Sequence, residues 1–261
     1  MAVASAPATS RPALPQWAAT TIAFGVVLVA WQIIGMTFFQ QTHSIPPPTD
    51  IIQSIRDDPD FYWRNLSATL QAAAQGWFWG NLLAITFAFL VLVLPAVERP
   101  LIQLGITSYC LPAVAIGPIF AIVFSGDTPR VVLAGLAVFF TTLVGALVGL
   151  RSADPTTLDV VHAFGGGRRK KLTKVRLRAS LPSLFAGLRV AAPAAVLGSI
   201  IGEYSGADQG IGVAMIASQQ RLDGPVTWSL ALVATAAAAV AYGLTALVGR
   251  LLTPWAPRGG V

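Results

Sequence analysis

Residues 154–182, DPTTLDVVHAFGGGRRKKLTKVRLRASLP, form a polar and strongly basic segment between two long apolar runs. Asp154 and Pro155 are typical of a helix start, because Asp accepts hydrogen bonds from free N–H groups and Pro fits the first turn. The three glycines at 165–167 predict the end of that helix. The segment therefore predicts two short helices that hang between membrane spans and bind a soluble partner. One face of the second helix would hold Leu172, Val175 and Ala179.

The composition is that of a membrane protein. The chain has 261 residues, of which 55% are hydrophobic and 11% are charged, whereas soluble domains have about 25% charged residues. Its net charge of +6 does not indicate nucleic acid, because the Lys and Arg of membrane proteins collect in cytoplasmic loops. One cysteine, Cys110, excludes an intramolecular disulfide, and His43 and His162 are too far apart in sequence to suggest a metal site.

Six apolar runs are long enough to cross a bilayer, which takes roughly 20 residues. We therefore predict an all-α membrane protein with a single transmembrane domain over 17–255, a disordered N-terminus at 1–16 and a short tail at 256–261. The first run is too long for the core of a signal peptide and is interpreted as an anchor. The expected spans cover about 17–39, 67–94, 101–124, 131–150, 184–202 and 228–252.

Charge predicts the orientation of these spans. Most of the 17 Lys and Arg lie in or beside segments 1–16, 95–100, 151–183 and 253–261, and most acids lie on the other side. Since Lys and Arg favour the cytoplasm, both termini and the loop 151–183 are predicted to be cytoplasmic. The basic residues assigned to the opposite side are Arg56, Arg64, Arg130 and Arg221.

The predicted external loop 40–66 contains three consecutive prolines at 46–48. These prolines favour an extended stretch, after which Thr49 or Asp50 can cap a short helix at 51–57. The loop is interpreted as a linker between two spans, and contact with an external partner is the alternative.

The basic loop resembles the EAA loop of ABC-importer permeases. In that family Glu-Ala-Ala is followed, after three residues, by Gly, and later by Ile-x-Leu-Pro. Here Asp159-Val160-Val161 precede Gly165 at the same spacing. The bulkier valines suggest that this loop is matched to its own ATPase.

The rest of the pattern fits in part. Val175 and Leu177 stand at the Ile and Leu positions, and Arg178 replaces the usual Pro. The following Ala179-Ser180-Leu181-Pro182 is similar to a second Leu-Pro in the sulfonate, taurine, nitrate and pyrimidine-precursor branch. Three further segments resemble the same branch, namely 45–52 (IPPPTDII), 110–118 (CLPAVAIGP) and 202–212 (GEYSGADQGIG).

The resemblance covers roughly residues 45–255 and implies a type I importer fold in the bacterial inner membrane. It implies a permease without an enzymatic site, with ATP and Mg held by separate cytoplasmic ATPase subunits and no cofactor or metal on this chain. The other implied partners are an external solute-binding protein and a second permease copy or a related permease. The implied ATPase-coupling residues are Asp159, Val160, Val161, Ala163, Phe164, Gly165, Val175 and Leu177. The candidates for a translocation path or gate are Glu203, Pro112 and Tyr109.

Several features have two interpretations. Glu203 lines a path or gate, or it is an interfacial carboxylate that water reaches. Pro112, Pro118 and Pro193 are hinges or static kinks. The small residues at 234–241 predict close helix packing. The basic side chains of the loop contact the ATPase or anionic lipid, or they are the ordinary positive charge of a cytoplasmic loop. They are Lys170, Lys171, Lys174, Arg176 and Arg178.

Two other classes of function are weighed against the permease. A stand-alone secondary transporter is expected to carry ion-coupling charges or broken inverted repeats, and neither is evident. An intramembrane serine hydrolase with Ser205 as nucleophile needs a His base in a neighbouring span, and both histidines fall in predicted loops. The branch handles small anions, sulfonates and nitrogen heterocycles, so the sequence leaves the substrate open.

Overall fold

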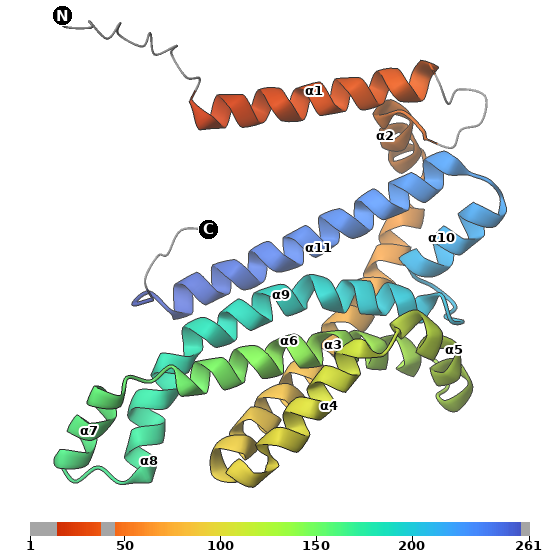
Figure 1. Cartoon of the computed structure of the whole chain (residues 1–261). Coiled ribbons are helices and arrows are strands. Elements are labelled where there is room, and N and C mark those ends of the chain that lie inside the picture. Colours follow the sequence, from red (N-terminus) through yellow and green to blue (C-terminus); the bar gives the residue numbers. More distant parts are fainter. Residues whose placement is uncertain (1–14, 38–44, 257–261) are drawn as a thin grey trace, which may run out of the picture.

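The computed structural model describes residues 15–37 and 45–256, and within these ranges every regular element is helical. Figure 1 shows an elongated bundle, with the first long helix (Gln16–Thr37) set apart from the other long helices. The predicted disordered N-terminus, His43 and nearly all of the C-terminal tail lie outside the described residues.

Five of the described helices are long and apolar enough to cross a membrane. Because all of them exceed roughly 18 residues, each can span a hydrocarbon core of about 30 Å. They are α1 (Gln16–Thr37), α3 (Pro59–Val93), α6 (Thr128–Arg151), the segment Lys171–Glu203 that ends in α9 (Leu177–Glu203), and α11 (Gly224–Leu252). The remaining elements are α2 (Pro48–Asp57), η1 (Pro95–Val97), α4 (Glu98–Cys110), α5 (Ala113–Val123), α7 (Pro155–Ala163), α8 (Arg168–Lys170), η2 (Lys171–Arg176) and α10 (Ile211–Gln220).

The expected third span over 101–124 is not one continuous helix. It is divided into α4 and α5 at Leu111 and Pro112. Leu111 has an extended backbone with ψ 123°, because the proline ring that follows disfavours helical geometry at the preceding residue. Pro118, in contrast, lies inside α5 without ending it. Pro112 is thus a helix break, whereas Pro118 is accommodated within a helix.

The expected fifth span also begins earlier than predicted. The basic residues after the glycines form α8 and the π-helical η2, and these continue directly into α9. The second helix of the loop is therefore the first part of a membrane-spanning helix rather than a separate element. Leu177 packs against a buried apolar cluster of α3, α4 and α6.

The centre of the bundle is the antiparallel pair α6 and α9, with α3 packed against both. Small residues allow the backbones to approach closely. A Cβ on Gly198 of α9 would lie 2.8 Å from the Cα of Ala134 in α6. A Cβ on Gly80 of α3 would lie 2.5 Å from the carbonyl oxygen of Gly135. Glycine is therefore required where these three helices cross.

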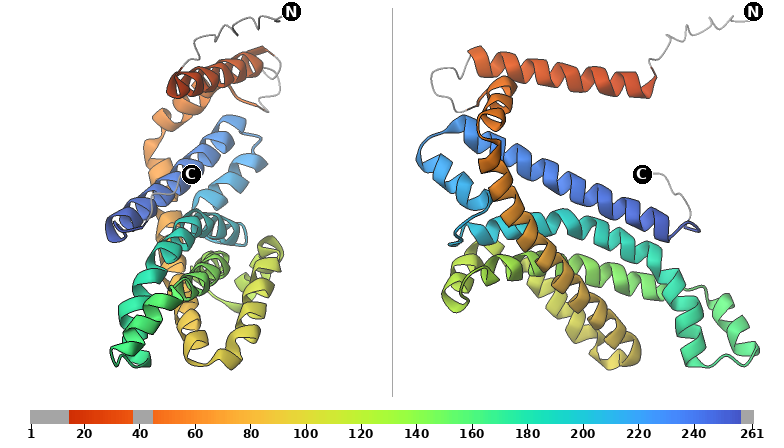
Figure 2. Two further views of the ribbon diagram at one scale, coloured as in Figure 1. Left: turned by 60° about the vertical axis from the view of Figure 1, so that its left-hand side comes forward. Right: turned by 180° about the vertical axis from the view of Figure 1, so that it is seen from behind.

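The helices α1 and α11 lie at the edge of the bundle, as Figure 2 shows. Few of their side chains are buried, and α1 packs chiefly on α2. Ala234 and Ala238 of α11 pack on the core, while Val240, Leu244 and Leu251 are exposed. The close packing predicted for 234–241 is thus present on one face of α11 only.

The Pro-rich loop leads from α1 into α2, and α2 packs against α11. The helix α2 begins at Pro48 with Pro47 at its N-cap, so the predicted cap by Thr49 or Asp50 is wrong. Ile51 is buried, and its carbonyl oxygen accepts a hydrogen bond from Ser229 of α11 at 3.1 Å. This part of the loop is a packed element rather than a free linker.

Candidate functional site

The first candidate site is the segment 152–167, which we call the α7 tip. Its helix, α7, is capped by Asp154, whose carboxylate accepts hydrogen bonds from the backbone N–H groups of Thr156 and Thr157 at 3.3 and 3.0 Å. The Thr157 hydroxyl donates a further bond at 2.9 Å. These bonds, led by the one from the Thr157 side chain, hold the pKa of Asp154 below its usual value. The predicted N-cap is confirmed.

The α7 tip ends in a tight turn. Phe164 closes α7, and Gly165 follows with a positive φ of 73°, a conformation that glycine adopts without steric cost. The backbone N–H of Gly166 then donates to the carbonyl of Val161 at 2.8 Å. The predicted glycine stop is therefore correct, and the turn sends the chain into α8.

The outer surface of α7 is open to solvent. Val160 is 52% exposed and Phe164 is 87% exposed, and Asp159 and Ala163 are exposed beside them, whereas Val161 is half-buried. The main packing partner of α7 is η2. A short capped helix that presents apolar side chains and a carboxylate is suited to a partner's cleft, because burial of the apolar groups is favourable and the carboxylate can accept charge-assisted hydrogen bonds there.

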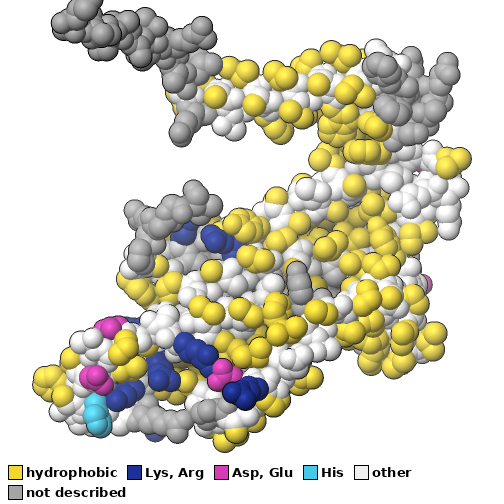
Figure 3. All heavy atoms as spheres, viewed as in Figure 1, with side chains coloured by type: hydrophobic (Ala, Val, Ile, Leu, Met, Phe, Trp, Pro, Cys, Tyr) yellow, Lys and Arg dark blue, Asp and Glu magenta, His cyan; other side chains and the backbone are white. Residues whose placement is uncertain are grey.

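The later motif residues have a different environment. Val175 and Leu177 are half-buried on the helix that enters the bundle, and Leu177 contacts its core. The Ser152 hydroxyl lies 3.1 Å from the carbonyl oxygen of Ala179, which ties the start of the α7 tip to α9. The structure thus brings the first half of the predicted coupling set to the surface and uses the second half to fix it to the bundle. Figure 3 shows that Lys and Arg gather near this end of the molecule.

A second candidate site lies at the opposite end of α9. The Glu203 side chain is 0% exposed, so the interpretation of a carboxylate reached by water is wrong for this chain. It accepts a hydrogen bond from the backbone N–H of Gly212 at 2.8 Å and one from the Ser199 hydroxyl at 3.3 Å. The guanidinium of Arg130 on α6 lies 3.9 Å away. A buried charge needs such partners.

Polar groups of three other helices complete this arrangement. Arg130 donates to the carbonyl of Gln209 at 3.0 Å and pairs with Asp127 at 2.6 Å. On α3, Asn65 accepts from the N–H of Gly210 at 3.2 Å, and Thr69 accepts from the N–H of Ile211 at 2.9 Å. We call this set the Glu203 cluster, comprising Asn65, Thr69, Arg130, Ser199, Glu203 and 209–212.

The Glu203 cluster gives the Gly-rich segment 202–212 a physical explanation. Gly210 has a φ of 136°, and a Cβ there would lie 2.2 Å from the carboxyl carbon of Glu203. The turn can therefore close over the carboxylate only when residue 210 is glycine. The segment 202–212 thereby fixes the start of α10 to α3, α6 and α9.

Sequence reasoning missed most of this cluster. Charge counting placed Arg130 on the external side, yet it is 6% exposed and donates to the carbonyl of Gln209 before α10. The one available signal was the spacing of Asn65 with Thr69 and of Ser199 with Glu203, since residues four apart lie on one helix face. No pattern in the sequence shows that the pair Asn65 and Thr69 lies near the pair Ser199 and Glu203. The hydrogen bonds of this cluster connect residues up to 145 positions apart.

The predicted path residues are not gathered in one place. Pro112 is exposed at the start of α5, and Glu203 is buried at the end of α9. Tyr109 belongs to α4, but its side chain lies outside what the structure describes. Buried Asn81 accepts a hydrogen bond from Thr142 at 2.5 Å, so it joins α3 to α6 rather than facing open space.

The serine hydrolase interpretation lacks a base. Ser205 lies beside α5, where a Cβ on Gly117 would meet its hydroxyl oxygen. His162 lies in α7, at the other end of α9. Within the described residues, no histidine is therefore positioned to activate Ser205.

Comparison with known proteins identifies the family. Residues 80–256 match the family of binding-protein-dependent transport system inner membrane components. This match covers more than half of the chain, and the chain belongs to this family.

Curated relatives have a similar length. A probable ABC transporter permease of Haemophilus influenzae is 28% identical over 199 residues, 76% of this chain and 81% of the relative. The formylaminopyrimidine transport permease ThiX of Halalkalibacterium halodurans is 26% identical over 237 residues, 90% and 94% of the two chains. The taurine transport permease TauC of Escherichia coli is 26% identical over 242 residues, 88% and 86% of the two. The family is one of transport permeases rather than enzymes, and it favours the permease over the secondary transporter and the hydrolase.

Proposed function

We propose that the α7 tip couples this permease to a cytoplasmic ATPase. The observation that carries the proposal is the exposure of Phe164 and Val160 on a helix fixed at both ends by local hydrogen bonds. An exposed aromatic side chain on a rigid support is the usual form of an anchor residue at a protein interface. Asp159, exposed beside them, is placed to accept hydrogen bonds from Arg or Lys of the ATPase.

The proposed assembly follows from this contact. Two ATPase subunits bind the α7 tips of this chain and of a second permease, and they hold ATP and Mg, while this chain binds no cofactor directly. ATP binding draws the two tips together and changes the arrangement of the spans, and hydrolysis resets it. The orientation places both termini in the cytoplasm of a bacterium, since the basic loop 151–183 is on the same side.

An external binding protein would deliver the solute at the end that carries the Glu203 cluster. In this assembly Glu203 anchors the turn before α10. Pro112 and Tyr109 remain candidates for the translocation path. The relatives are named for formylaminopyrimidine, taurine and riboflavin. The proposed substrate is accordingly a small polar solute, with its specificity set mainly by the binding protein.

The test is co-purification of the ATPase with the permease from gently solubilised membranes. Phe164→Asp and Asp159→Arg change the exposed surface without altering a buried contact. We expect both variants to lose the ATPase while keeping the thermal stability of the wild type. Leu222→Asp is the control, because Leu222 is 89% exposed and lies at the other end of the molecule, before α11.

Retention of the ATPase by both α7 variants would overturn the coupling proposal. Loss of the ATPase by Leu222→Asp as well would show a general loss of assembly rather than a local contact. The match between the bulky Val160-Val161 pair and its own ATPase has a separate test, which is transport with the ATPase of a related importer. Full transport with that ATPase would contradict the match.

A further inference from the structure

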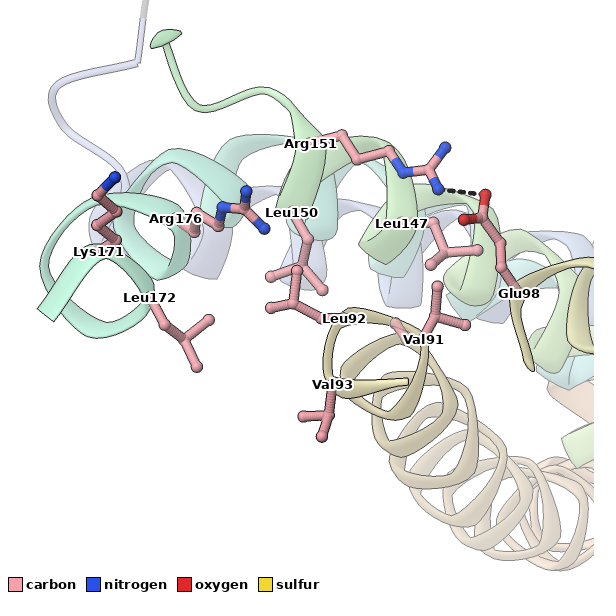
Figure 4. A pocket seen from close by; sticks show the side chains of 11 residues that line it. Val91, Leu92, Val93, Glu98, Leu147, Leu150, Arg151, Lys171, Leu172 and Arg176 are labelled. Atoms are coloured by element: carbon pink, nitrogen blue, oxygen red, sulfur yellow. Dashed lines mark ion pairs between the residues drawn. The ribbon is translucent and has the colours of Figure 1, made fainter. Parts of the chain in front are cut away.

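The structure has an amphipathic cavity of about 480 Å³ at the α7 end of the bundle. It lies where α3 ends, α4 begins, α6 ends and η2 enters the bundle. Its volume is in the range of small-molecule sites. Figure 4 shows Arg176 extending from η2 toward Leu150 of α6. The lining residues are Ala88, Val91, Leu92, Val93, Glu98, Leu147, Leu150, Arg151, Lys171, Leu172 and Arg176.

The charged groups of this cavity leave an excess of positive charge. Arg151 forms an ion pair with Glu98. Lys171 and Arg176 are half-buried and, among the described residues, form no ion pair with a carboxylate. A partly buried cation without a counter-charge is unfavourable until an anion joins it. The cavity is therefore complementary to a negatively charged group.

A second cavity, of about 250 Å³, continues the first along the bundle. The two cavities share Ala88 and Leu150. The second is lined mainly by apolar side chains, which include Ile85, Phe89 and Leu184. Ile85 lies three residues before Ala88, which both cavities share, so this furrow runs roughly 4.5 Å farther into the membrane-spanning part. The combined shape has a cationic mouth and an apolar extension.

We propose that these cavities bind one anionic phospholipid of the cytoplasmic leaflet. The phosphate lies against Lys171 and Arg176, and an acyl chain lies in the furrow beside Ile85, Phe89 and Leu184. Basic pockets between spans at the cytoplasmic surface favour anionic headgroups, and each Lys or Arg adds about 1 kcal/mol. A zwitterionic lipid lacks the net charge that this mouth requires.

The apolar extension distinguishes a lipid from the other possible occupants. A free phosphate would satisfy Lys171 and Arg176 but would leave the furrow empty. The ATPase proposed to bind the exposed face of α7 would not reach a furrow among α3, α6 and α9. The lipid proposal depends on the proposed orientation in one respect only, which is the assignment of the cavity to the cytoplasmic leaflet.

The test measures binding of phosphatidylglycerol to the delipidated full-length permease by native mass spectrometry. Lys171→Gln combined with Arg176→Gln removes both unpaired charges of the mouth. The matched control is Arg169→Gln combined with Lys174→Gln, which removes the same charge from exposed positions of the same segment. We expect the mouth variant to bind phosphatidylglycerol about thirtyfold more weakly and the control to bind like the wild type.

A second pair of variants tests the furrow. Leu181→Trp fills the second cavity, which Leu181 lines, whereas Leu197→Trp adds the same bulk at a 60% exposed position of the same helix. The first is expected to weaken lipid binding and the second to leave it unchanged. Measuring the folded fraction of each variant separates lost binding from lost structure.

Three results would overturn the proposal. The first is equal binding by the mouth and control variants, and the second is equal binding of phosphatidylcholine. The third is displacement of the lipid by inorganic phosphate alone, with no effect of Leu181→Trp, which would indicate a phosphate site. The assay needs no ATPase and no transport, so its failure would leave the coupling proposal intact, and the reverse also holds.

Discussion

The two ends of α9 are built in opposite ways. At the N-terminal end, the α7 tip is held mainly by hydrogen bonds between residues at most five positions apart, such as Asp154 with Thr157, and by one longer bond from Ser152 to Ala179. At the C-terminal end, the Glu203 cluster adds to its local bonds, such as Glu203 with Gly212, several bonds across 79 to 145 positions. The α7 tip is exposed and the cluster is buried.

This difference predicts different consequences of mutation. A surface made by local bonds can change its side chains without unfolding the bundle, which suits a segment that binds a partner. A buried set of long-range polar bonds cannot lose a member cheaply, because the remaining groups are left without partners in a low-dielectric interior. Substitutions at the two ends therefore separate binding from stability.

The largest effect is expected for Glu203→Ala. It leaves the buried N–H of Gly212 without its acceptor and removes one of the two carboxylates beside the guanidinium of Arg130, which keeps Asp127. Loss of a charged member from such a buried polar set costs about 3 kcal/mol. We expect a marked fall in the thermal stability and folded yield of the detergent-solubilised protein. Glu98→Ala is the control, since its pair with Arg151 is partly exposed and contributes at most about 1 kcal/mol. Equal thermal stability of the two variants would contradict the claim that the buried Glu203 cluster stabilises the bundle.

A smaller loss is expected for Gly210→Ala. The new Cβ would occupy space held by the Glu203 carboxyl group, at a φ of 136°, and strain of this kind costs about 1–3 kcal/mol. Gly167→Ala is the comparison at the α7 end, because nothing lies within 4 Å of a Cβ there. Thermal unfolding should show a clear decrease for the first variant and almost none for the second. A tolerated Ala at 210 would contradict the closed turn.

A local effect is expected for Asp154→Ala. The change removes the acceptor for the Thr156 and Thr157 N–H groups, so α7 should fray while the bundle stays folded. Hydrogen exchange of residues 155–163 should accelerate without a change in global thermal stability. Asp154→Asn, which keeps an acceptor, should restore slow exchange. A fall in global stability would show that the α7 tip is part of the core.

The smallest effect is the pH response of the same cap. Hydrogen bonds lower the pKa of Asp154 from the ordinary aspartate value of 3.8, so the cap stabilises α7 fully above that value. This contribution is lost as pH falls below 3.8 and through the lower pKa of the folded state. A spin label at Ala163→Cys, in a Cys110→Ser background, should gain mobility in that acidic range. Asp154→Asn should abolish the response to acid. A change in spin-label mobility near neutral pH would contradict the assignment of the response to Asp154.

Local sequence signals predicted the α7 tip well. Asp154, Pro155 and Gly165 act within one turn of the backbone, so their identities fix where α7 begins and ends. Predictions that depended on neighbours in space were weaker. Leu111 and Pro112 divide the expected third span, and η2 joins the expected second loop helix to α9. Charge counting placed Arg130 on the external side, and only the fold shows that its side chain is buried.

By itself, the sequence determined the membrane class, the positions of most spans, the family resemblance and the boundaries of α7. These depend on hydrophobic length, on charge and on contacts between residues close in the chain. Only the tertiary structure decided that Glu203 meets Arg130 and Gly212, and that Lys171 and Arg176 share a cavity with Glu98. Arg130 and Glu203, like Glu98 and Arg176, are more than 70 positions apart in sequence, and only the packing of the helices brings them to one site.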